Sequence, residues 1–260
     1  MLECVINISE GRDLAVIERI AAAAGGSLLD LHTDPHHHRS VLTLVGEEAA
    51  RAVAIETVRL LDLRSHAGAH PRIGVLDVVP FVPLGDTSLP EAIAARDRFC
   101  AWAGEELDLP CFAYGPERTL PEVRRHAFGD LDPTCGPAHA HPTAGGAAVG
   151  ARPVLVAYNV WLAEPDLGLA RRVAGSIRRP GLRTLGLQVG ARAQVSMNLV
   201  DPDAVGPDTA TDAVAGHAEV AGCELVGLLP RSVLHRVPET RWTELDLSED
   251  KTIESRLSAT

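Results

Sequence analysis

Histidine-rich segments are the part of this sequence best suited to chemistry. Eight of its eleven histidines fall in three short segments, 32–39, 64–74 and 139–146. Imidazole titrates near neutral pH and can accept and return a proton, and the arginines that accompany these segments match carboxylates. The segments therefore predict a site that moves protons on a small, carboxylate-bearing molecule. The histidines concerned are His32, His36, His37, His38, His66, His70, His139 and His141.

His70 is the strongest candidate for a general base. Pro71 restrains the residue before it to extended geometry, and Arg72 follows at once. An imidazole at this position could accept a proton from a reacting amine and return it to a leaving group. The residues alone leave one alternative open, a histidine held by backbone hydrogen bonds at the start of a strand.

A metal site is the second interpretation of the histidines. Imidazoles suit zinc, nickel or copper, and His32 with the run 36–38 would supply ligands. The pattern H-E-x-x-H is absent, and three consecutive loop histidines cannot all face one ion. The five cysteines are scattered without a C-x-x-C pair, which indicates reduced thiols. We therefore expect no metal, and we expect His36 to be solvated.

Arg39, Arg72 and Arg152 each border a histidine segment. Guanidinium groups would bind a dicarboxylic amino acid or a carboxylate-bearing cofactor, although a surface ion pair explains any one of them alone equally well. A phosphate loop is not indicated, because the glycine-rich run 145–150 lacks G-K-[ST] and precedes a strand. A serine hydrolase is disfavoured because no G-x-S-x-G is present.

The first half of the chain must position most of these residues. Pro80 and Pro83 predict that the far end of one strand lies at a sheet edge. The run Ser88-Leu89-Pro90-Glu91 has the S-x-x-E form of a capping box and predicts a helix from there to about Leu107. Apolar periodicity predicts strands at 2–8, 27–31, 41–45, 73–82 and 111–114, and helices at 13–24 and 50–61.

The second half repeats this order after a segment of small residues. Glycine, proline and alanine occupy 13 of the 22 positions in 130–151, which predicts a linker or a loop that a ligand can approach closely. Each half reads βαββαβ, so we expect an α+β fold of two ferredoxin-like subdomains. Beyond the small-residue segment, strands are expected at 154–160, 183–188, 193–199 and 224–228, and helices at 165–176 and 208–221.

Composition narrows the functional classes. The chain has 260 residues, of which 46% are hydrophobic and 23% charged, typical of a globular protein that folds without disulfides or metal. A net charge of −11 and only 3% aromatic residues disfavour nucleic acid as a partner. No apolar run approaches the roughly 18 residues of a membrane span, and no signal peptide is recognised. We expect a cytoplasmic protein without a membrane partner.

At the histidine segments the sequence resembles the glutamate formimidoyltransferase (formiminotransferase) family, and the resemblance extends over nearly the whole chain. The long run His66-Ala67-Gly68-Ala69-His70-Pro71-Arg72-Ile73-Gly74 is its most specific part. Further matching stretches are 3–11, Asp34-Pro35 with His37 and Arg39, 75–83, 141–145, 150–152, 157–159, 194–199 and 225–230.

The resemblance implies the fold and the reaction. It implies an N-terminal subdomain over 1–150 and a C-terminal subdomain over 151–260, with a folate tunnel between them, and a homodimer. Such enzymes move a formimino group between N-formimidoyl-L-glutamate and N5 of tetrahydrofolate, a co-substrate, in one-carbon metabolism and histidine degradation. The cyclodeaminase domain of some relatives has no counterpart here, so a separate cyclodeaminase would process the product.

The resemblance also assigns residues. His70 corresponds to the catalytic histidine of the family, and the segment 136–145 to its folate-binding loop. Four residues depart from those that some members carry, and each change could alter the donor or acceptor. An aspartate is replaced by His32 and another by His36, an asparagine by His38 and a tryptophan by Ala144. The residues expected to bind folate or the second substrate are Asn7, His32, Asp34, His37, Arg39, Arg72, Gly136, His141, Thr143, Ala144, Gly145 and Arg152.

Three alternatives stay open at this point. The same fold could use 5-formyltetrahydrofolate and transfer a formyl group to glutamate. The altered loop histidines could instead leave a folate-binding protein without catalysis. A metal-dependent hydrolase is the third alternative.

Overall fold

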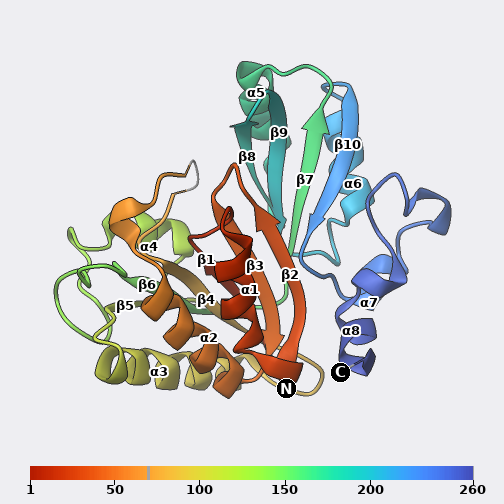
Figure 1. Ribbon diagram of the computed structural model, residues 1–260. Coiled ribbons are helices and arrows are strands. Elements are labelled where there is room, and N and C mark those ends of the chain that lie inside the picture. Colours follow the sequence, from red (N-terminus) through yellow and green to blue (C-terminus); the bar gives the residue numbers. More distant parts are fainter. Residues whose placement is uncertain (69–70, 260) are drawn as a thin grey trace. The chain divides into compact units, whose positions relative to one another are not determined.

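The computed structural model describes residues 1–68 and 71–259 and divides into two compact units, Met1–Pro153 and Val154–Thr260. The two units are described separately below (Figure 1). His70, the predicted catalytic residue, lies outside the described residues. Within the described part of the chain, every helix is too short or too polar to cross a membrane.

Unit 1 contains the predicted βαββαβ order, followed by an addition of two helices and two strands. The addition inserts α3, β5, α4 and β6 after the ferredoxin-like core. The elements are β1 (Leu2–Ile8), α1 (Leu14–Ala22), β2 (Leu28–Asp34), β3 (Arg39–Val45), α2 (Glu47–Leu60), β4 (Leu76–Pro83), α3 (Leu89–Glu106), β5 (Cys111–Tyr114), α4 (Leu120–His126) and β6 (Ala147–Ala151).

The six strands of unit 1 form one sheet in the order β2-β3-β1-β4-β6-β5. The first four strands pair antiparallel, in the arrangement of a ferredoxin-like sheet. Strand β6 then pairs parallel to β4 and to β5. Figure 1 shows α3 and α4 on opposite faces of the parallel part, which agrees with their packing into separate apolar clusters.

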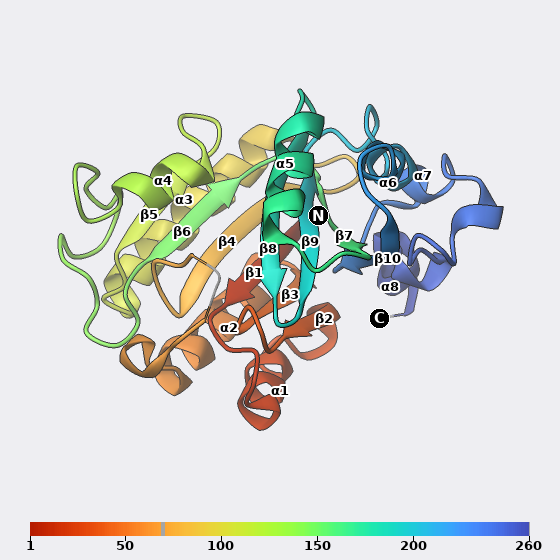
Figure 2. The same ribbon diagram turned by 90° about the horizontal axis from the view of Figure 1, so that it is seen from above.

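The main core of unit 1 lies between the sheet and the helices α1, α2 and α3 (Figure 2). The predicted capping box at the start of α3 is confirmed. The Ser88 backbone N–H donates to Glu91 Oε2 at 2.7 Å, and the Glu91 N–H donates to Ser88 Oγ at 3.4 Å. Because these bonds satisfy amide groups that a helix start leaves open, α3 begins where the sequence predicts. Its inner face then buries Phe99.

The prediction of a loop over the whole of 130–151 is wrong at its end. Residues Ala147–Ala151 form β6, a fully buried strand between β4 and β5. The small side chains have a packing reason here: a Cβ on Gly150 would lie 2.0 Å from Cζ of Tyr114, so the tyrosine ring covers the glycine. Low side-chain volume therefore indicated a covered strand at these positions rather than a linker.

The prediction that Pro80 and Pro83 place their strand at a sheet edge is also wrong. Strand β4 is interior, with β1 on one side and β6 on the other. The ladder to β1 is interrupted between the pairs Cys4–Phe81 and Asn7–Val78, and Pro80 lies opposite this interruption. A proline without an N–H is therefore accommodated where this ladder forms no pair, and the shift in register lies elsewhere, between Asn7 and Ile8.

Unit 2 confirms the predicted second βαββαβ order. Its four strands form an antiparallel sheet in the order β10-β7-β9-β8, again the ferredoxin-like arrangement. A C-terminal segment of short helices follows β10. The elements are β7 (Val156–Leu162), α5 (Leu167–Ile177), β8 (Leu182–Val189), β9 (Arg192–Leu199), α6 (Pro207–Ala215), β10 (Val220–Val226), α7 (Arg231–Leu234) and α8 (Ile253–Ala259).

The core of unit 2 lies on the face of the sheet that α5 and α6 cover. Alternate residues of the central strands point into it, as the period of two in a strand requires. Tyr158 is the largest of them and is fully buried, and its hydroxyl donates to the carbonyl oxygen of Leu245 at 2.7 Å. This hydrogen bond ties the C-terminal segment to the sheet.

Candidate functional site

The face of the unit 1 sheet opposite α1, α2 and α3 carries predicted site residues of the first three strands. The register of β1, β3 and β2 places Asn7, Val41 and His32 side by side in one row. Arg39 follows in the adjoining row, and its Nε donates to Asn7 Oδ1 at 2.9 Å. The Asn7 amide is fixed in turn, since Nδ2 donates to the carbonyl oxygen of Val5 at 3.0 Å. The structure thus brings Asn7, His32 and Arg39 to one surface.

Asp77 is the acidic centre of this region. It is 2% exposed, and its Oδ2 accepts a hydrogen bond from Arg124 Nη2 at 2.5 Å. Arg39 Nη1 lies 3.8 Å from the same oxygen. The other oxygen, Oδ1, accepts from the backbone N–H of Ile73 at 2.9 Å. One buried carboxylate therefore joins β3, β4, α4 and the segment before β4.

Several positive charges lie close together around Asp77. Burial, together with the nearby charges of Arg124 and Arg72, lowers the pKa of Arg39 to about 10 against the opposing effect of Asp77. Burial likewise lowers the pKa of Arg72. A bound anion would relieve this repulsion, because it adds the opposite charge to a partly desolvated cationic site.

Tyr114 and Arg152 border the same charged group. Burial raises the pKa of Tyr114, although the charges of Arg152 and Arg124 oppose the rise. Arg152 follows β6 directly, and its Nη1 donates to the carbonyl oxygen of Pro153 at 3.0 Å. Arg39, Arg72 and Arg152 were predicted from the sequence, and the structure adds Arg124 and Tyr114. We call Arg39, Arg72, Arg124, Arg152, Asp77 and Tyr114 the arginine cluster.

Asp34 and His37 form a closed turn between β2 and β3. His37 Nδ1 lies 2.6 Å from Asp34 Oδ2, and the backbone N–H groups of His36 and His37 donate to Asp34 Oδ1 at 2.7 and 2.9 Å. Burial alone would raise the pKa of Asp34, but the bonds from His37 outweigh it and hold the pKa well below its usual range. The aspartate therefore acts first as the support of this turn.

His38 and His66 stack next to that turn. Their ring centroids are 4.1 Å apart with an interplanar angle of 13°. His38 Nε2 lies 2.9 Å from Glu10 Oε1, and His66 Nε2 lies 2.9 Å from the carbonyl oxygen of His38. Burial lowers the pKa of His66, which favours the neutral imidazole. A Cβ on Gly68 would approach the carbonyl oxygen of His37 to 2.7 Å, so the two histidine segments touch.

The third histidine segment folds back on itself and packs against the second. His141 and Gly145 exchange backbone hydrogen bonds of 2.8 and 3.0 Å. Inside this turn, His141 Nδ1 accepts from the Ala144 N–H at 2.9 Å and lies 3.3 Å from the Thr143 nitrogen. Nδ1 is therefore an acceptor, which leaves the ring proton on Nε2 when the imidazole is neutral.

Close backbone contact joins this turn to the segment before β4. The Val75 N–H donates to the carbonyl oxygen of Ala144 at 2.9 Å, and the Gly146 N–H donates to that of Ile73 at 2.9 Å. A Cβ on Gly74 would lie 2.0 Å from the Gly146 oxygen. The predicted residues His141, Thr143, Ala144 and Gly145 are thus held beside the second histidine segment.

Gly136 lies apart from the residues just described. It has a φ of +84°, and a Cβ there would approach the carbonyl oxygen of Leu109 to 2.6 Å. A Cβ on Gly104 of α3 would in turn meet the Gly136 nitrogen at 2.6 Å. Packing against the end of α3 thus explains why a glycine stands here.

Among residues 1–68 and 71–259, no group of three or more histidine, cysteine, aspartate or glutamate side chains is arranged to hold a metal ion. The histidines 36–38 do not share one partner. The ring of His37 contacts Asp34, and the ring of His38 contacts Glu10. His36 contributes only its backbone N–H to the turn.

Sequence reasoning missed Arg124 and Tyr114. Arg124 lies in the short helix α4, which the sequence analysis did not predict, and Tyr114 was recognised only as the end of a strand. A signal for the helix was present, since Thr119 and Glu122 form a second S/T-x-x-E capping box. No local pattern links either side chain to Asp77.

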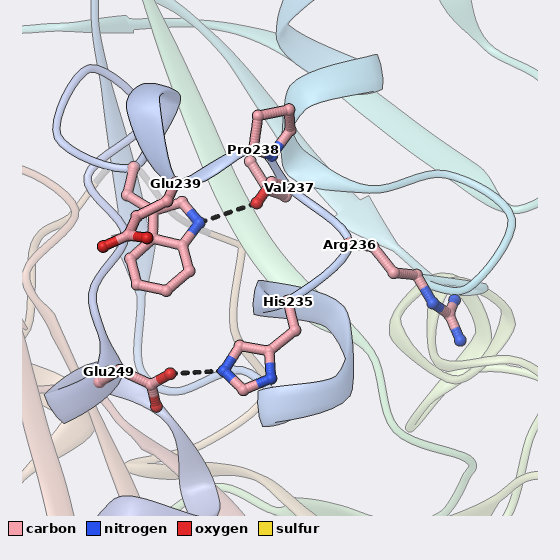
Figure 3. A pocket seen from close by; sticks show the side chains of 7 residues that line it. His235, Arg236, Val237, Pro238, Glu239 and Glu249 are labelled. Atoms are coloured by element: carbon pink, nitrogen blue, oxygen red, sulfur yellow. Dashed lines mark hydrogen bonds and ion pairs between the residues drawn. The ribbon is translucent and has the colours of Figure 1, made fainter.

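Unit 2 has a shallow surface pocket of about 530 Å³, and none of the predicted site residues lines it (Figure 3). In this pocket the Glu249 carboxylate faces the His235 ring, with Oε1 and Nε2 2.5 Å apart. The indole N–H of Trp242 donates to the carbonyl oxygen of Val237 at 2.9 Å. These contacts connect parts of the C-terminal segment with one another.

Known proteins resemble the chain over most of its length. Residues 1–152 match the model of the "Formiminotransferase domain, N-terminal subdomain". The chain is 34% identical to a glutamate formimidoyltransferase of Streptococcus pyogenes serotype M1, over 92% of each chain. It is 32% identical to a glutamate formimidoyltransferase of Thermoplasma acidophilum, over 90% of this chain and 89% of that protein.

A longer relative matches this chain over about half of its own length. The formimidoyltransferase-cyclodeaminase of Rattus norvegicus is 33% identical over 90% of this chain, and the match spans 51% of the rat protein. Both the family model and the identities extend across the β-strands and loops that carry the arginine cluster. The chain therefore belongs to the formiminotransferase family of enzymes.

Proposed function

We propose that this protein transfers a formimino group between N-formimidoyl-L-glutamate and N5 of tetrahydrofolate, in one-carbon metabolism and histidine degradation. Family membership supports the reaction type. The arginine cluster supports the substrate class and carries the proposal, because Arg39, Arg72 and Arg124 lie near a single buried carboxylate, and burial together with neighbouring arginines depresses the pKa of Arg39. Such a site favours a dicarboxylate.

The chemistry requires one new bond and one broken bond at the same carbon. N5 of tetrahydrofolate attacks the amidine carbon and forms a tetrahedral intermediate. The bond from that carbon to the glutamate nitrogen then breaks, and glutamate leaves as an amine. The proton lost from N5 must reach the leaving nitrogen, and His70 is the proposed base and acid for this relay.

The other predicted residues take binding roles in this proposal. Arg39, Arg72 and Arg152 hold carboxylates of glutamate or of the folate tail. Asn7, His32, Asp34 and His37 form or support the surface beside them. The turn of His141, Thr143, Ala144 and Gly145, with the preceding segment from Gly136, is the proposed folate loop. Its close backbone packing against Ile73–Val75 supports this assignment, since it fixes the loop beside the second histidine segment.

The subdomain assignment and the assembly are further parts of the proposal. We assign 1–150 and 151–260 as the N-terminal and C-terminal subdomains of the family. The homodimer, the cytoplasmic location and the separate cyclodeaminase rest on the resemblance and composition alone. Tetrahydrofolate is a co-substrate in this proposal, and no metal takes part.

The test follows substituted folate by its ultraviolet spectrum. The full chain is incubated with tetrahydrofolate and N-formimidoyl-L-glutamate, and in a second arm with 5-formyltetrahydrofolate and glutamate. We expect transfer in the first arm and a loss of kcat on the order of 10²–10⁴ in His70→Ala. His217→Ala, at an exposed histidine outside the three histidine segments, is the matched control.

Three results would contradict the proposal. Transfer in the second arm alone would assign a formyl donor. Tight folate binding without transfer in either arm would indicate a binding protein. Turnover of His70→Ala within a few-fold of the wild type would remove the assigned base.

A further inference from the structure

Arg124 contacts two parts of the arginine cluster that are separate in sequence. Its Nη2 donates to Asp77 Oδ2 at 2.5 Å, and its Nη1 donates to the carbonyl oxygen of Pro71. The side chain is 16% exposed. The guanidinium therefore fastens the end of α4 to β4 and to the segment that precedes it.

Asp77 completes the same bridge from the strand. While Oδ2 faces Arg124, Oδ1 accepts from the Ile73 N–H at 2.9 Å. Pro71 and Ile73 are thus each held by one member of the ion pair, and Arg72 lies between them. The Arg72 guanidinium in turn donates to the carbonyl oxygen of Gly68. The turn formed by residues 71–73 is anchored at both of its ends.

A direct role in binding substrate fits Arg124 less well than a role in holding this turn. Two of its nitrogens already donate to protein oxygens, and one of those oxygens belongs to a carboxylate that is 2% exposed. A substrate carboxylate would have to compete with Asp77 at short range. A charged hydrogen bond of this kind is stronger than a neutral one, so the competition is unfavourable.

We propose that Arg124 and Asp77 are positioning residues for the transfer reaction. They hold the segment 71–73, and with it Arg72, where the reaction requires it. This inference rests on the proposed function, because His70 and Arg72 matter to turnover only if the protein catalyses the transfer. A displacement of about 1 Å in a reacting group can lower a rate about 10²-fold.

The kinetic test is a double-mutant cycle of Arg124→Gln and Asp77→Asn, with kcat normalised to the folded fraction. We expect each single variant to lower kcat about 10²-fold and to change KM less than kcat. We expect the double variant to lose no more than either single variant within about threefold, because both residues belong to one bridge. Arg125→Gln is the control, since Arg125 is the exposed next residue of α4.

Hydrogen exchange tests the bridge without relying on activity. The Ile73 N–H donates to Asp77 Oδ1, and it becomes less protected if the bridge opens. We expect Arg124→Gln to speed exchange in the segment 71–75 at least about tenfold. Arg125→Gln should leave exchange in this segment unchanged.

Each outcome decides the proposal. Unchanged exchange in Arg124→Gln would overturn the bridge whatever the activity. A raised KM with kcat unchanged, or losses that multiply in the double variant, would show that Arg124 binds substrate instead. If the wild type transfers no formimino group, the proposed function fails and the positioning role in transfer fails with it. The exchange data then decide separately whether the bridge holds the turn.

Discussion

The carboxylate of Asp77 accepts a 2.5 Å hydrogen bond from Arg124, a residue 47 positions further along the chain. The bond connects the strand next to the centre of the sheet to a helix on the helix-poor face. The same carboxylate approaches Arg39. Asp77 is therefore an acidic group to which two arginines of the cluster are directed.

Replacement of Asp77 by asparagine should lower the free energy of unfolding by on the order of 3 kcal/mol. Removal of one partner leaves the charges of Arg124 and Arg39 without compensation in a partly desolvated site. Chemical denaturation at neutral pH measures the change. Asp130→Asn is the control, because the Asp130 side chain is 75% exposed and an exposed ion pair contributes little to stability. Equal losses in the two variants would contradict the role of burial.

Gly74→Ala should destabilise the protein by about 1–3 kcal/mol. The added Cβ would lie 2.0 Å from the Gly146 oxygen and 2.5 Å from the Ala144 oxygen, so the proposed folate loop must move. Folate affinity, measured by fluorescence titration, should fall with stability. Gly175→Ala in α5 meets no atom within 4 Å and should be neutral or stabilise by up to about 1 kcal/mol. A neutral Gly74→Ala would show that the loop yields easily.

Two variants of His141 should distinguish a structural role of this residue from a role in binding substrate. His141→Ala removes the acceptor of the Ala144 N–H, a 2.9 Å bond, and should cost about 1–2 kcal/mol of stability. His141→Asn places an amide oxygen near the position of Nδ1 and should restore most of that loss. If the imidazole also binds substrate through Nε2, His141→Asn should keep a raised KM for folate. Full recovery of KM in His141→Asn would limit this residue to a structural role.

Asp34 should make stability depend on acid pH. Its folded-state pKa is lowered, so its carboxylate stabilises the protein above the unfolded-state pKa of about 3.9. That contribution is lost as the pH falls from there through the folded-state pKa. The difference in unfolding free energy between wild type and Asp34→Asn should stay constant from about pH 5 to 7 and shrink below about pH 4. Asp86→Asn, at an exposed turn, should show no such change.

Arg72→Gln should raise the KM for N-formimidoyl-L-glutamate about 10- to 100-fold, the range expected when a charged hydrogen bond is lost. Steady-state kinetics with the glutamate donor measures this. The same comparison with a donor whose side-chain carboxylate is an amide identifies the partner, since wild type and variant should then differ much less. An equal difference with both donors would place Arg72 away from that carboxylate.

The fold could be predicted further than the site. The period of hydrophobic residues and the capping box at Ser88 and Glu91 are local signals, and both βαββαβ units followed from such signals. Strand β6 could not be recognised in this way, because its five small residues have no periodicity and are buried under Tyr114. The prediction of a sheet edge from Pro80 was wrong for a similar reason, because the interruption of the ladder at Pro80 depends on pairing with β1.

The sequence indicated candidate site residues where they lie in one segment of the chain. It did not indicate those that come together only in the folded structure. Arg39, Arg72 and Arg152 border histidine segments, which made them visible as candidates. Arg124 joins them through Asp77, across a distance in sequence that no motif covers. The sequence therefore marked these segments as candidates for chemistry, but it did not predict the ion pair between Arg124 and Asp77.

One oxygen of Asp77 faces two guanidinium groups, and this arrangement has a consequence for how the protein can evolve. A change at position 77, 39 or 124 alone leaves a charge without its counterpart in a site with little water. Tolerated changes should therefore occur in correlated pairs or triplets. An alignment of many orthologues should show covariation among these three columns, even though the residues lie on different strands and a helix.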